Sequence, residues 1–146
     1  MSLSIIVPML NEEAGIAAAL LALRKLDGEI VAVDGGSRDK TLACARPHAA
    51  QLLSSPRGRA RQMNAGAASA QGEILLFLHA DTTLPANAGQ AITEAINQGA
   101  VWGRFDVCIA GNSAWFPLIA TLMNLRSPLT GIATGDQAIF VRRSSF

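Results

Sequence analysis

The sequence has little charge for its length, and this shortage excludes several classes of protein. Only 16% of the 146 residues are charged and the formal net charge is +1, so there is no strong field to attract nucleic acid. Half of the residues are hydrophobic, which is too many for a disordered chain and suits a chain with a real core. We therefore expect one globular domain over residues 1–146, with no nucleic-acid partner.

Cysteine is also scarce, and long apolar runs are missing. Cys44 and Cys108 lie far apart without a CxxC spacing, so neither a zinc site nor a disulfide framework is indicated. The first residues have no basic start and only a short apolar run, unlike a signal peptide. The stretch 114–125, "AWFPLIATLMNL", is too short to span a bilayer and contains Pro117. We expect reduced thiols, a cytoplasmic location, and in 114–125 either a packed helix or a helix on a membrane surface.

Apolar runs with strand character alternate with segments of helical periodicity along the chain. Strands are expected at 3–10, 29–37, 49–55 and 74–78, with an edge strand at 100–110 and a final strand at 136–143. Helices are expected at 12–25, 38–46, 57–70, 85–97 and 113–126. This alternation predicts an α/β fold, a three-layer sandwich in which helices cover both faces of a mainly parallel sheet.

Carboxylates stand at the ends of three of the expected parallel strands. Glu12 follows the first strand, Asp34 lies at the exit of the second, and Asp81 follows the strand at 74–78. Ligands of such sheets bind beyond the carboxyl ends of the strands. Carboxylates gathered at one edge repel one another unless a cation or a hydrogen-bonding ligand offsets the repulsion. The pattern therefore predicts a ligand site, although Asp34 followed by two glycines also suits a tight turn.

The common glycine-rich phosphate loops are missing from this sequence. The first strand is followed by "PMLNEEAG" and not by GxGxxG, and no glycine-rich loop leads into Lys followed by Ser or Thr. A bound phosphate would therefore need a metal held by Asp81, or the guanidinium groups of Arg57, Arg59 and Arg61. Three cations at the start of a helix are unfavourable by themselves, which favours an anionic partner over a solvated helix start.

Four segments, in this order, resemble the motifs of the family 2 glycosyltransferases, which have the GT-A fold. They are "SIIVPMLNEEAGI", "VDGGSRDKT", "RQMNAGAASAQGE" and "LLFLHADTTLP". The variants "RARQMNAGA", "LHADT" and "TGDQAIFVRR" are most similar to the bacterial subgroup of rSAM/selenodomain-associated transferases. The resemblance covers almost the whole chain. It implies a GT-A-like domain that binds a nucleotide-diphosphate sugar together with Mg²⁺ or Mn²⁺.

The resemblance also implies roles for residues around the nucleoside. Pro8, Asn11 and Glu12 would lie around the base and the ribose. Asp34 matches the acidic residue of the family that accepts a hydrogen bond from a ring N–H or a ribose hydroxyl. The ligand site predicted from the strand ends would thus be a sugar-nucleotide site.

Other matched residues would face the diphosphate. Arg61 and Asn64 occupy the segment that borders the base and the diphosphate in this family. Asp81 matches the last acidic residue of the family's D-x-D motif, so it would coordinate the metal that offsets charge on the leaving group. His79 replaces the first acidic residue of that motif. It would contact phosphate or ribose, or it is a histidine packed near the core.

Two further departures concern acidic residues of the family. Gly35 stands where a second acidic residue usually follows Asp34. The Glu-Asp pair that supplies the catalytic base in this family would lie beyond Phe146, so we expect a chain that is incomplete at its C-terminal end. Asp136 is the acidic residue near that end, and it would either act as the base or position the acceptor.

The reaction implied by the resemblance is transfer of the sugar to an acceptor hydroxyl with inversion at the anomeric carbon. The apolar segment 114–125 is consistent with a lipid-linked acceptor, with peripheral membrane contact, or with a homodimer interface. The alternative is an inactive sugar-nucleotide-binding module that lacks the base. A nucleotidyltransferase is more distant, because "PMLNEEAG" is not the glycine-rich, arginine-containing loop that such enzymes carry after the first strand.

Overall fold

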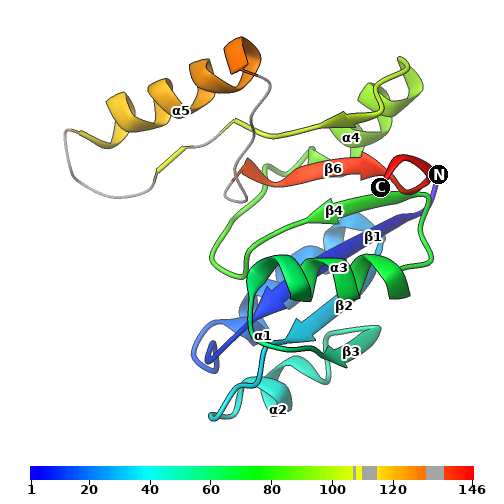
Figure 1. Cartoon of the computed structure of the whole chain (residues 1–146), viewed down its shortest axis with the longest axis vertical. Helices are drawn as coiled ribbons and strands as arrows, with labels where there is room; N and C mark the ends of the chain where they lie inside the picture. The colour runs from blue at the N-terminus through cyan, green and yellow to red at the C-terminus, as the bar shows by residue number, and fades with distance from the viewer. Residues whose placement is uncertain (107, 110–114, 131–136) are drawn as a thin grey trace.

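The computed structural model describes residues 1–106, 108–109, 115–130 and 137–146. A six-stranded sheet with the order β3-β2-β1-β4-β6-β5 runs through it (Figure 1). β1 (Leu3–Met9), β2 (Glu29–Asp34), β3 (Gln51–Ser54) and β4 (Ile74–Phe77) are parallel. β6 (Ile139–Arg142) is antiparallel to β4, and the short β5 (Trp102–Gly103) is antiparallel to β6 at the edge. The predicted α/β fold with a mainly parallel sheet is confirmed.

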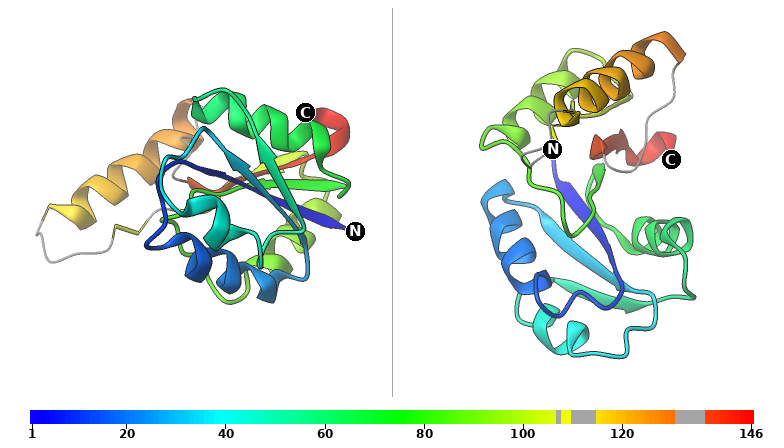
Figure 2. Two further views of the ribbon diagram at one scale, coloured as in Figure 1. Left: turned by 90° about the horizontal axis from the view of Figure 1, so that it is seen from below. Right: turned by 90° about the vertical axis from the view of Figure 1, so that its left-hand side faces the viewer.

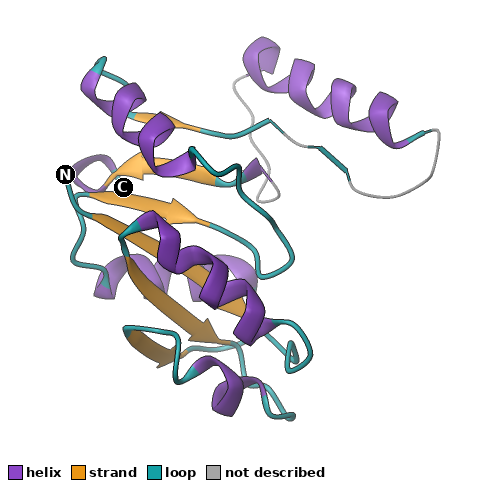
Figure 3. Cartoon of the chain, turned by 180° about the vertical axis from the view of Figure 1, so that it is seen from behind, coloured by secondary structure: helices purple, strands orange, loops and turns teal. Residues whose placement is uncertain are grey.

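Helices cover both faces of the sheet, as the alternation of the sequence predicts. α1 (Ile16–Leu23), α2 (Thr41–Ala45) and α4 (Ala88–Asn97) lie on one face, and α3 (Arg59–Ser69) lies on the other (Figures 2 and 3). β1 is buried along its whole length because it has helices on both sides. Ile5 and Val7 belong to the core beneath α1 and α4, whereas Ile6 belongs to the core beneath α3. These cores are the interfaces of a three-layer sandwich.

α3 approaches the sheet closely at Gly66. A Cβ atom at this position would lie 2.5 Å from Ile6 Cγ2 and 3.1 Å from Val33 Cγ2. Real Cβ atoms are essentially never found at the first of these distances, so a glycine lets the helix backbone rest on two β-branched side chains of the sheet. This contact fixes the distance between α3 and the ends of β1 and β2.

Several elements are shorter than the sequence predicts. α2 begins at Thr41, not at 38, because residues 35–40 form a loop that binds the loop after β1. α4 begins at Ala88, and within the described residues of the strand expected over 100–110, only β5 is a strand. A short 3₁₀ helix, η1 (Arg24–Leu26), continues α1, and another, η3 (Arg143–Ser145), follows β6. The parallel strands agree better with the prediction because their apolar runs are continuous.

α5 (Phe116–Thr130) projects away from the edge of the sheet (Figure 1). Arg104 holds it, because Nη2 of this residue donates to the carbonyl oxygen of Asn124 at 2.9 Å. We call its exposed apolar residues the α5 stripe; they are Trp115, which precedes the helix, and Leu118, Ile119, Leu122 and Leu125. None of the helices that the structure describes has the length and apolar character needed to cross a membrane.

Two arginines at the amino end of the parallel strand β4 bind the ends of helices. Arg142 Nη2 donates to the carbonyl oxygen of Ile96 in α4 at 2.6 Å, and Arg143 Nη1 donates to that of Ala70 after α3 at 2.7 Å. Cations are favourable there because the last carbonyl groups of a helix carry partial negative charge. These arginines therefore have a structural role, although a cavity of about 520 Å³ lies beside them.

Candidate functional site

The loops that follow β1 and β2 are hydrogen-bonded to each other. The Asn11 N–H donates to Ser37 Oγ, and the Arg38 N–H donates to Asn11 Oδ1, both at 2.9 Å. Asn11 has a φ of +54°, which asparagine tolerates better than most residues. Its side chain therefore joins the two loops, and it does not face the pocket described below.

Thr41 and Asp39 hold the backbone around Glu12. The Glu12 N–H donates to Thr41 Oγ1 at 2.7 Å, and the Glu13 N–H donates to Asp39 Oδ2 at 3.2 Å. The Thr41 hydroxyl in turn donates to Asp39 Oδ1 at 2.5 Å. That hydroxyl, together with backbone N–H groups, holds the pKa of Asp39 below its ordinary value. The second loop thus fixes the place from which Glu12 extends.

Asp34 is buried at the end of β2, and its carboxylate binds the turn that follows. Oδ2 accepts from the N–H groups of Gly36 and Ser37 at 2.9 and 3.0 Å, and Oδ1 accepts from the Ser37 hydroxyl. These contacts are those of the tight turn that the two glycines suggested. Asp34 does not line the pocket, so its contact with a base or ribose stays a prediction.

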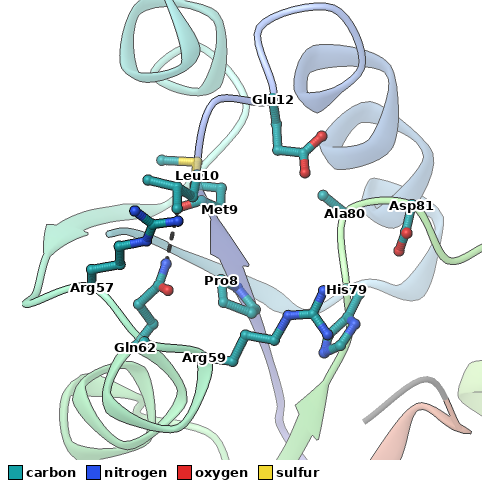
Figure 4. Close-up of a pocket in the computed structure, with 11 residues that line it drawn as sticks. Pro8, Met9, Leu10, Glu12, Arg57, Arg59, Gln62, His79, Ala80 and Asp81 are labelled. Carbon is teal, nitrogen blue, oxygen red and sulfur yellow. Dashed lines mark hydrogen bonds between the residues drawn. The ribbon is translucent and has the colours of Figure 1, made fainter. Parts of the chain in front are cut away.

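A pocket of about 370 Å³ opens at the carboxyl ends of β1 and β4, beside the start of α3 (Figure 4). Four of the residues that the family resemblance indicated line it: Pro8 near the end of β1, Glu12 in the loop after β1, and His79 and Asp81 after β4. The loop before α3 and its first turn contribute Arg57, Arg59 and Gln62. His79 is buried, whereas Glu12 and Asp81 are exposed. Glu12 and Asp81 therefore reach the same cavity from different strands.

Two predicted residues of α3 are not part of this pocket. Arg61 and Asn64 are exposed on α3 and do not line it. The helix begins at Arg59, so Arg59 and Gln62, three residues apart, share the face that meets the cavity. Asp136, the proposed base, lies outside the described residues. The roles given to Asn11, Asp34, Arg61 and Asn64 stay predictions that the pocket lining does not support.

Gln62 is a residue of the pocket that the sequence analysis missed. It is only 3% exposed, and its Nε2 donates to the carbonyl oxygens of Met9 at 2.9 Å and Val33 at 2.8 Å. A Cβ on Gly35 would lie 3.0 Å from Gln62 Cδ, so the amide occupies the space that a side chain at position 35 would need. The signal in the sequence was a glutamine one helical turn after Arg59, within an alanine-rich helix.

The pocket carries charges of both signs. Arg57 and Arg59 supply two cations, and the first N–H groups of α3 face the same region without a capping side chain, because the cap residue is Gly58. Glu12 and Asp81 supply two anions. Guanidinium groups and a helix N-terminus bind phosphate, and the exposed carboxylates are hard oxygen ligands. The arrangement suits an anionic ligand that carries a divalent cation.

The residues present fit a cation that is shared with a ligand. Within the described part of the chain, no three His, Cys, Asp or Glu side chains are arranged to hold a metal ion by themselves. Mg²⁺ usually binds through one or two carboxylates together with substrate phosphates and water. Asp81 would supply such a carboxylate, with Glu12 in the same pocket.

Comparison of the sequence with known proteins gives a consistent result. The family model described as glycosyl transferase family 2 matches residues 4–145. An uncharacterised glycosyltransferase of Mycobacterium tuberculosis is 28% identical over 125 residues, which are 84% of this chain and 57% of that protein. A PGL/p-HBAD biosynthesis glycosyltransferase of the same organism is 40% identical over 91 residues, 56% of this chain and 36% of that protein. The chain thus spans about half the length, or less, of these relatives.

Solved structures resemble the fold over nearly the whole chain. A glucosyl-3-phosphoglycerate synthase of Mycobacterium tuberculosis, crystallised with Mn²⁺ and UDP-glucose, has a TM-score of 0.71 at 22% identity, covering 98% of this chain and 56% of that one. A mannosyl-3-phosphoglycerate synthase of Rubrobacter xylanophilus has a TM-score of 0.70 at 18% identity, covering 100% and 54%. This likeness confirms the expected GT-A-like fold.

Proposed function

The chain belongs to glycosyl transferase family 2, and from this premise we propose that it transfers a sugar from a nucleotide-diphosphate donor to an acceptor hydroxyl. The observation that carries the proposal is the pocket in which two arginines, an uncapped helix N-terminus and two carboxylates meet. Within this proposal, residues 1–146 belong to one transferase domain. The "RARQMNAGA" and "LHADT" variants favour the rSAM/selenodomain-associated subgroup.

Each side of the pocket has its own part in donor binding. Arg57 and Arg59 would bind the diphosphate, since guanidinium groups form paired hydrogen bonds with phosphate oxygens. Pro8 and Glu12, at the end of β1, would contact the nucleoside. Because Arg57 and Arg59 line the pocket and Arg61 does not, we assign the phosphate contact to the first two of the three arginines considered from the sequence.

Asp81 would hold Mg²⁺ or Mn²⁺ against the diphosphate, with His79 beside it. The metal would neutralise charge on the departing diphosphate. Structural neighbours of this chain were crystallised with Mn²⁺ and UDP-glucose and with Mg²⁺ and UDP, which supports this part of the proposal. His79 is buried, so it would orient neighbouring groups more than it would bind metal.

The acceptor would bind on the side of the sugar opposite the departing diphosphate. Inversion would follow from direct displacement by an acceptor hydroxyl whose proton passes to a carboxylate. Asp136, the residue predicted for that role or for placing the acceptor, lies outside the described residues. The exposed α5 stripe supports an apolar contact, and we propose a membrane surface or a lipid-linked acceptor ahead of a homodimer interface. A cytoplasmic location at the inner face of the membrane stays a prediction. An inactive sugar-nucleotide-binding module is the alternative function.

Calorimetric titration with UDP, GDP, CDP and dTDP, each with and without Mn²⁺, tests the proposal. We expect one diphosphate to bind, and Mn²⁺ to strengthen this binding. Asp81→Ala should remove most of the effect of Mn²⁺, weakening binding about tenfold, which corresponds to about 1.4 kcal/mol. Glu94→Ala on the exposed face of α4 removes the same charge far from the pocket and should leave binding unchanged. If the folded wild-type chain binds none of the four diphosphates, the proposal is wrong.

A further inference from the structure

Gln62 has an amide group whose orientation is fixed by the protein. Both N–H bonds of Nε2 are used, since this nitrogen donates to the carbonyl oxygens of Met9 and Val33 at the ends of β1 and β2. The reversed amide would place an oxygen against two carbonyl oxygens, which is repulsive, so the network allows one orientation. The close approach of Gly35 below the amide restricts it further.

The oxygen of the same amide faces the pocket without a donor. In the part of the chain that the structure describes, no N–H or O–H donates to Gln62 Oε1, and this atom remains open to the cavity that Gln62 lines. Figure 4 shows the amide nitrogen turned toward Met9 and the oxygen turned toward the pocket. The side chain is 97% buried, with 3% exposed, so it offers a single oriented acceptor to a ligand.

We propose that Gln62 Oε1 accepts a hydrogen bond from the nucleoside of the donor. This inference rests on the proposed function and adds to it a residue that selects the nucleotide. The groups able to donate are a ring N–H of the base and a hydroxyl of the ribose. Gln62 is held by the strand ends of β1 and β2, and Pro8 and Met9 of β1 also line the cavity, so the nucleoside would lie over these strand ends.

A fixed acceptor of this kind discriminates between ligands, because a ligand without a matching donor leaves the acceptor oxygen without a hydrogen bond. A ligand with a donor at this position gives Oε1 a hydrogen bond in exchange for one to solvent, at little cost. A ligand without one leaves a desolvated oxygen unpaired, which costs the full desolvation of that group. A site built to hydrogen-bond a substrate group rejects analogues that lack it much more strongly than an apolar pocket rejects a change of size.

For each analogue, the test is a cycle of four titrations, in which wild type and Gln62→Met each bind the parent nucleotide and the analogue. For UDP, the analogues are 3-methyluridine diphosphate, which lacks the ring N–H, and 2′-deoxyuridine diphosphate, which lacks the 2′-hydroxyl. For GDP, they are the 1-methyl and 2′-deoxy forms. We expect one analogue to bind wild type at least about tenfold more weakly than the parent nucleotide, as one buried hydrogen bond requires. In Gln62→Met, the same analogue should lose less than about twofold.

The pattern of results separates the donor groups and the two levels of the proposal. Coupling to the methylated base assigns the N–H, and coupling to the deoxyribose analogue assigns the hydroxyl. Equal losses for wild type and Gln62→Met with both analogues would overturn the role of Gln62 while leaving the proposed function intact. If no diphosphate binds the folded wild type, the proposed function fails, and this inference fails with it.

A measurement on the wild-type protein covers the case in which Gln62→Met does not fold. In Gln62→Met, the carbonyl oxygen of Met9 still accepts from the Gly35 N–H at 3.0 Å, but the carbonyl oxygen of Val33 loses its hydrogen bond from Gln62, and this loss destabilises the fold. In ¹⁵N NMR spectra, the side-chain NH₂ signals of Gln62 should shift on addition of the parent nucleotide and shift clearly less with the coupled analogue. Signals that move equally with all three ligands, or not at all, would overturn the inference.

Discussion

Replacing Gly66 by alanine tests whether the contact between α3 and the sheet places the pocket residues. The added Cβ would lie 2.5 Å from Ile6 Cγ2 and 3.1 Å from Val33 Cγ2. Both side chains are buried and β-branched, so they have little rotamer freedom with which to yield. Overpacking of this kind costs about 1–3 kcal/mol. Glycine-to-alanine substitution inside a helix otherwise gains up to about 1 kcal/mol.

The matched control is Gly89→Ala in α4. Its Cβ would meet Leu26 Cδ2 at 3.6 Å, an ordinary van der Waals distance, so only the helix gain remains. We expect Gly89→Ala to stabilise the chain by about 0.5–1 kcal/mol and Gly66→Ala to destabilise it by about 1 kcal/mol or more. Urea unfolding of wild type and the two variants measures these differences in the free energy of unfolding, provided that its dependence on urea concentration has the same slope in all three proteins.

Gly66→Ala should also affect ligand binding, because α3 carries Arg59 and Gln62 into the pocket. Moving α3 away from the sheet would lengthen the hydrogen bonds from Gln62 to the strand ends. We expect Gly66→Ala to bind the nucleoside diphosphate several-fold more weakly and Gly89→Ala to bind it as wild type does. Equal stabilisation by both substitutions would refute the reasoning about this contact.

Three further predictions concern other parts of the chain. Burial acts to raise the pKa of Glu29, but hydrogen bonds from Ser4, Gln71 and Gln51 hold this pKa below the ordinary 4.5. The stability that these hydrogen bonds provide is therefore present above pH 4.5, and it is lost as the pH falls below that value. Because Glu29 is partly exposed, Glu29→Gln should lower the stability by only about 1 kcal/mol at pH 7. Thermal unfolding scans from pH 7 to pH 3 should then show a weaker dependence of stability on pH than in wild type; an unchanged dependence would contradict the role given to Glu29. Thr41→Val keeps the shape but removes the acceptor of the Glu12 N–H, so calorimetry should show nucleotide binding weakened several-fold, whereas Thr41→Ser should bind as wild type does. Leu122→Glu in the α5 stripe should abolish sedimentation with lipid vesicles, whereas Thr93→Glu on α4 should not; a dimer that Leu122→Glu dissociates would instead assign the stripe to a homodimer.

The parallel strands were predictable because a strand that is buried on both faces consists mainly of apolar residues. β1, β2 and β4 are mainly apolar, and the structure places β1 and β4 with little change, whereas β2 ends at Asp34 and not at 37. The loop after β2 was less predictable. Ser37 suits a helix cap, but its hydroxyl and N–H bind Asp34, and its Oγ accepts from Asn11, so the helix starts later. Periodicity does not reveal such contacts between loops.

The candidate site was predictable at its strand ends and only in part at its helix. Glu12, His79 and Asp81 lie at strand exits, and the rule for parallel sheets brought them together. In α3, each residue along the chain turns the side chain by about 100°, so an uncertainty of one or two residues in the helix start changes the face. Of the three arginines considered from the sequence, the family resemblance singled out Arg61, whereas Arg57 and Arg59 line the pocket; Gln62 was not considered.

The most direct test of the central claim is a crystal structure of the chain grown with Mn²⁺ and the nucleoside diphosphate that binds most tightly. We predict an anomalous manganese peak within coordination distance of the Asp81 carboxylate, with the diphosphate between the metal and Arg57 or Arg59. A nucleotide bound elsewhere, for instance in the cavity beside Arg142 and Arg143, or manganese without contact to Asp81, would contradict the claim.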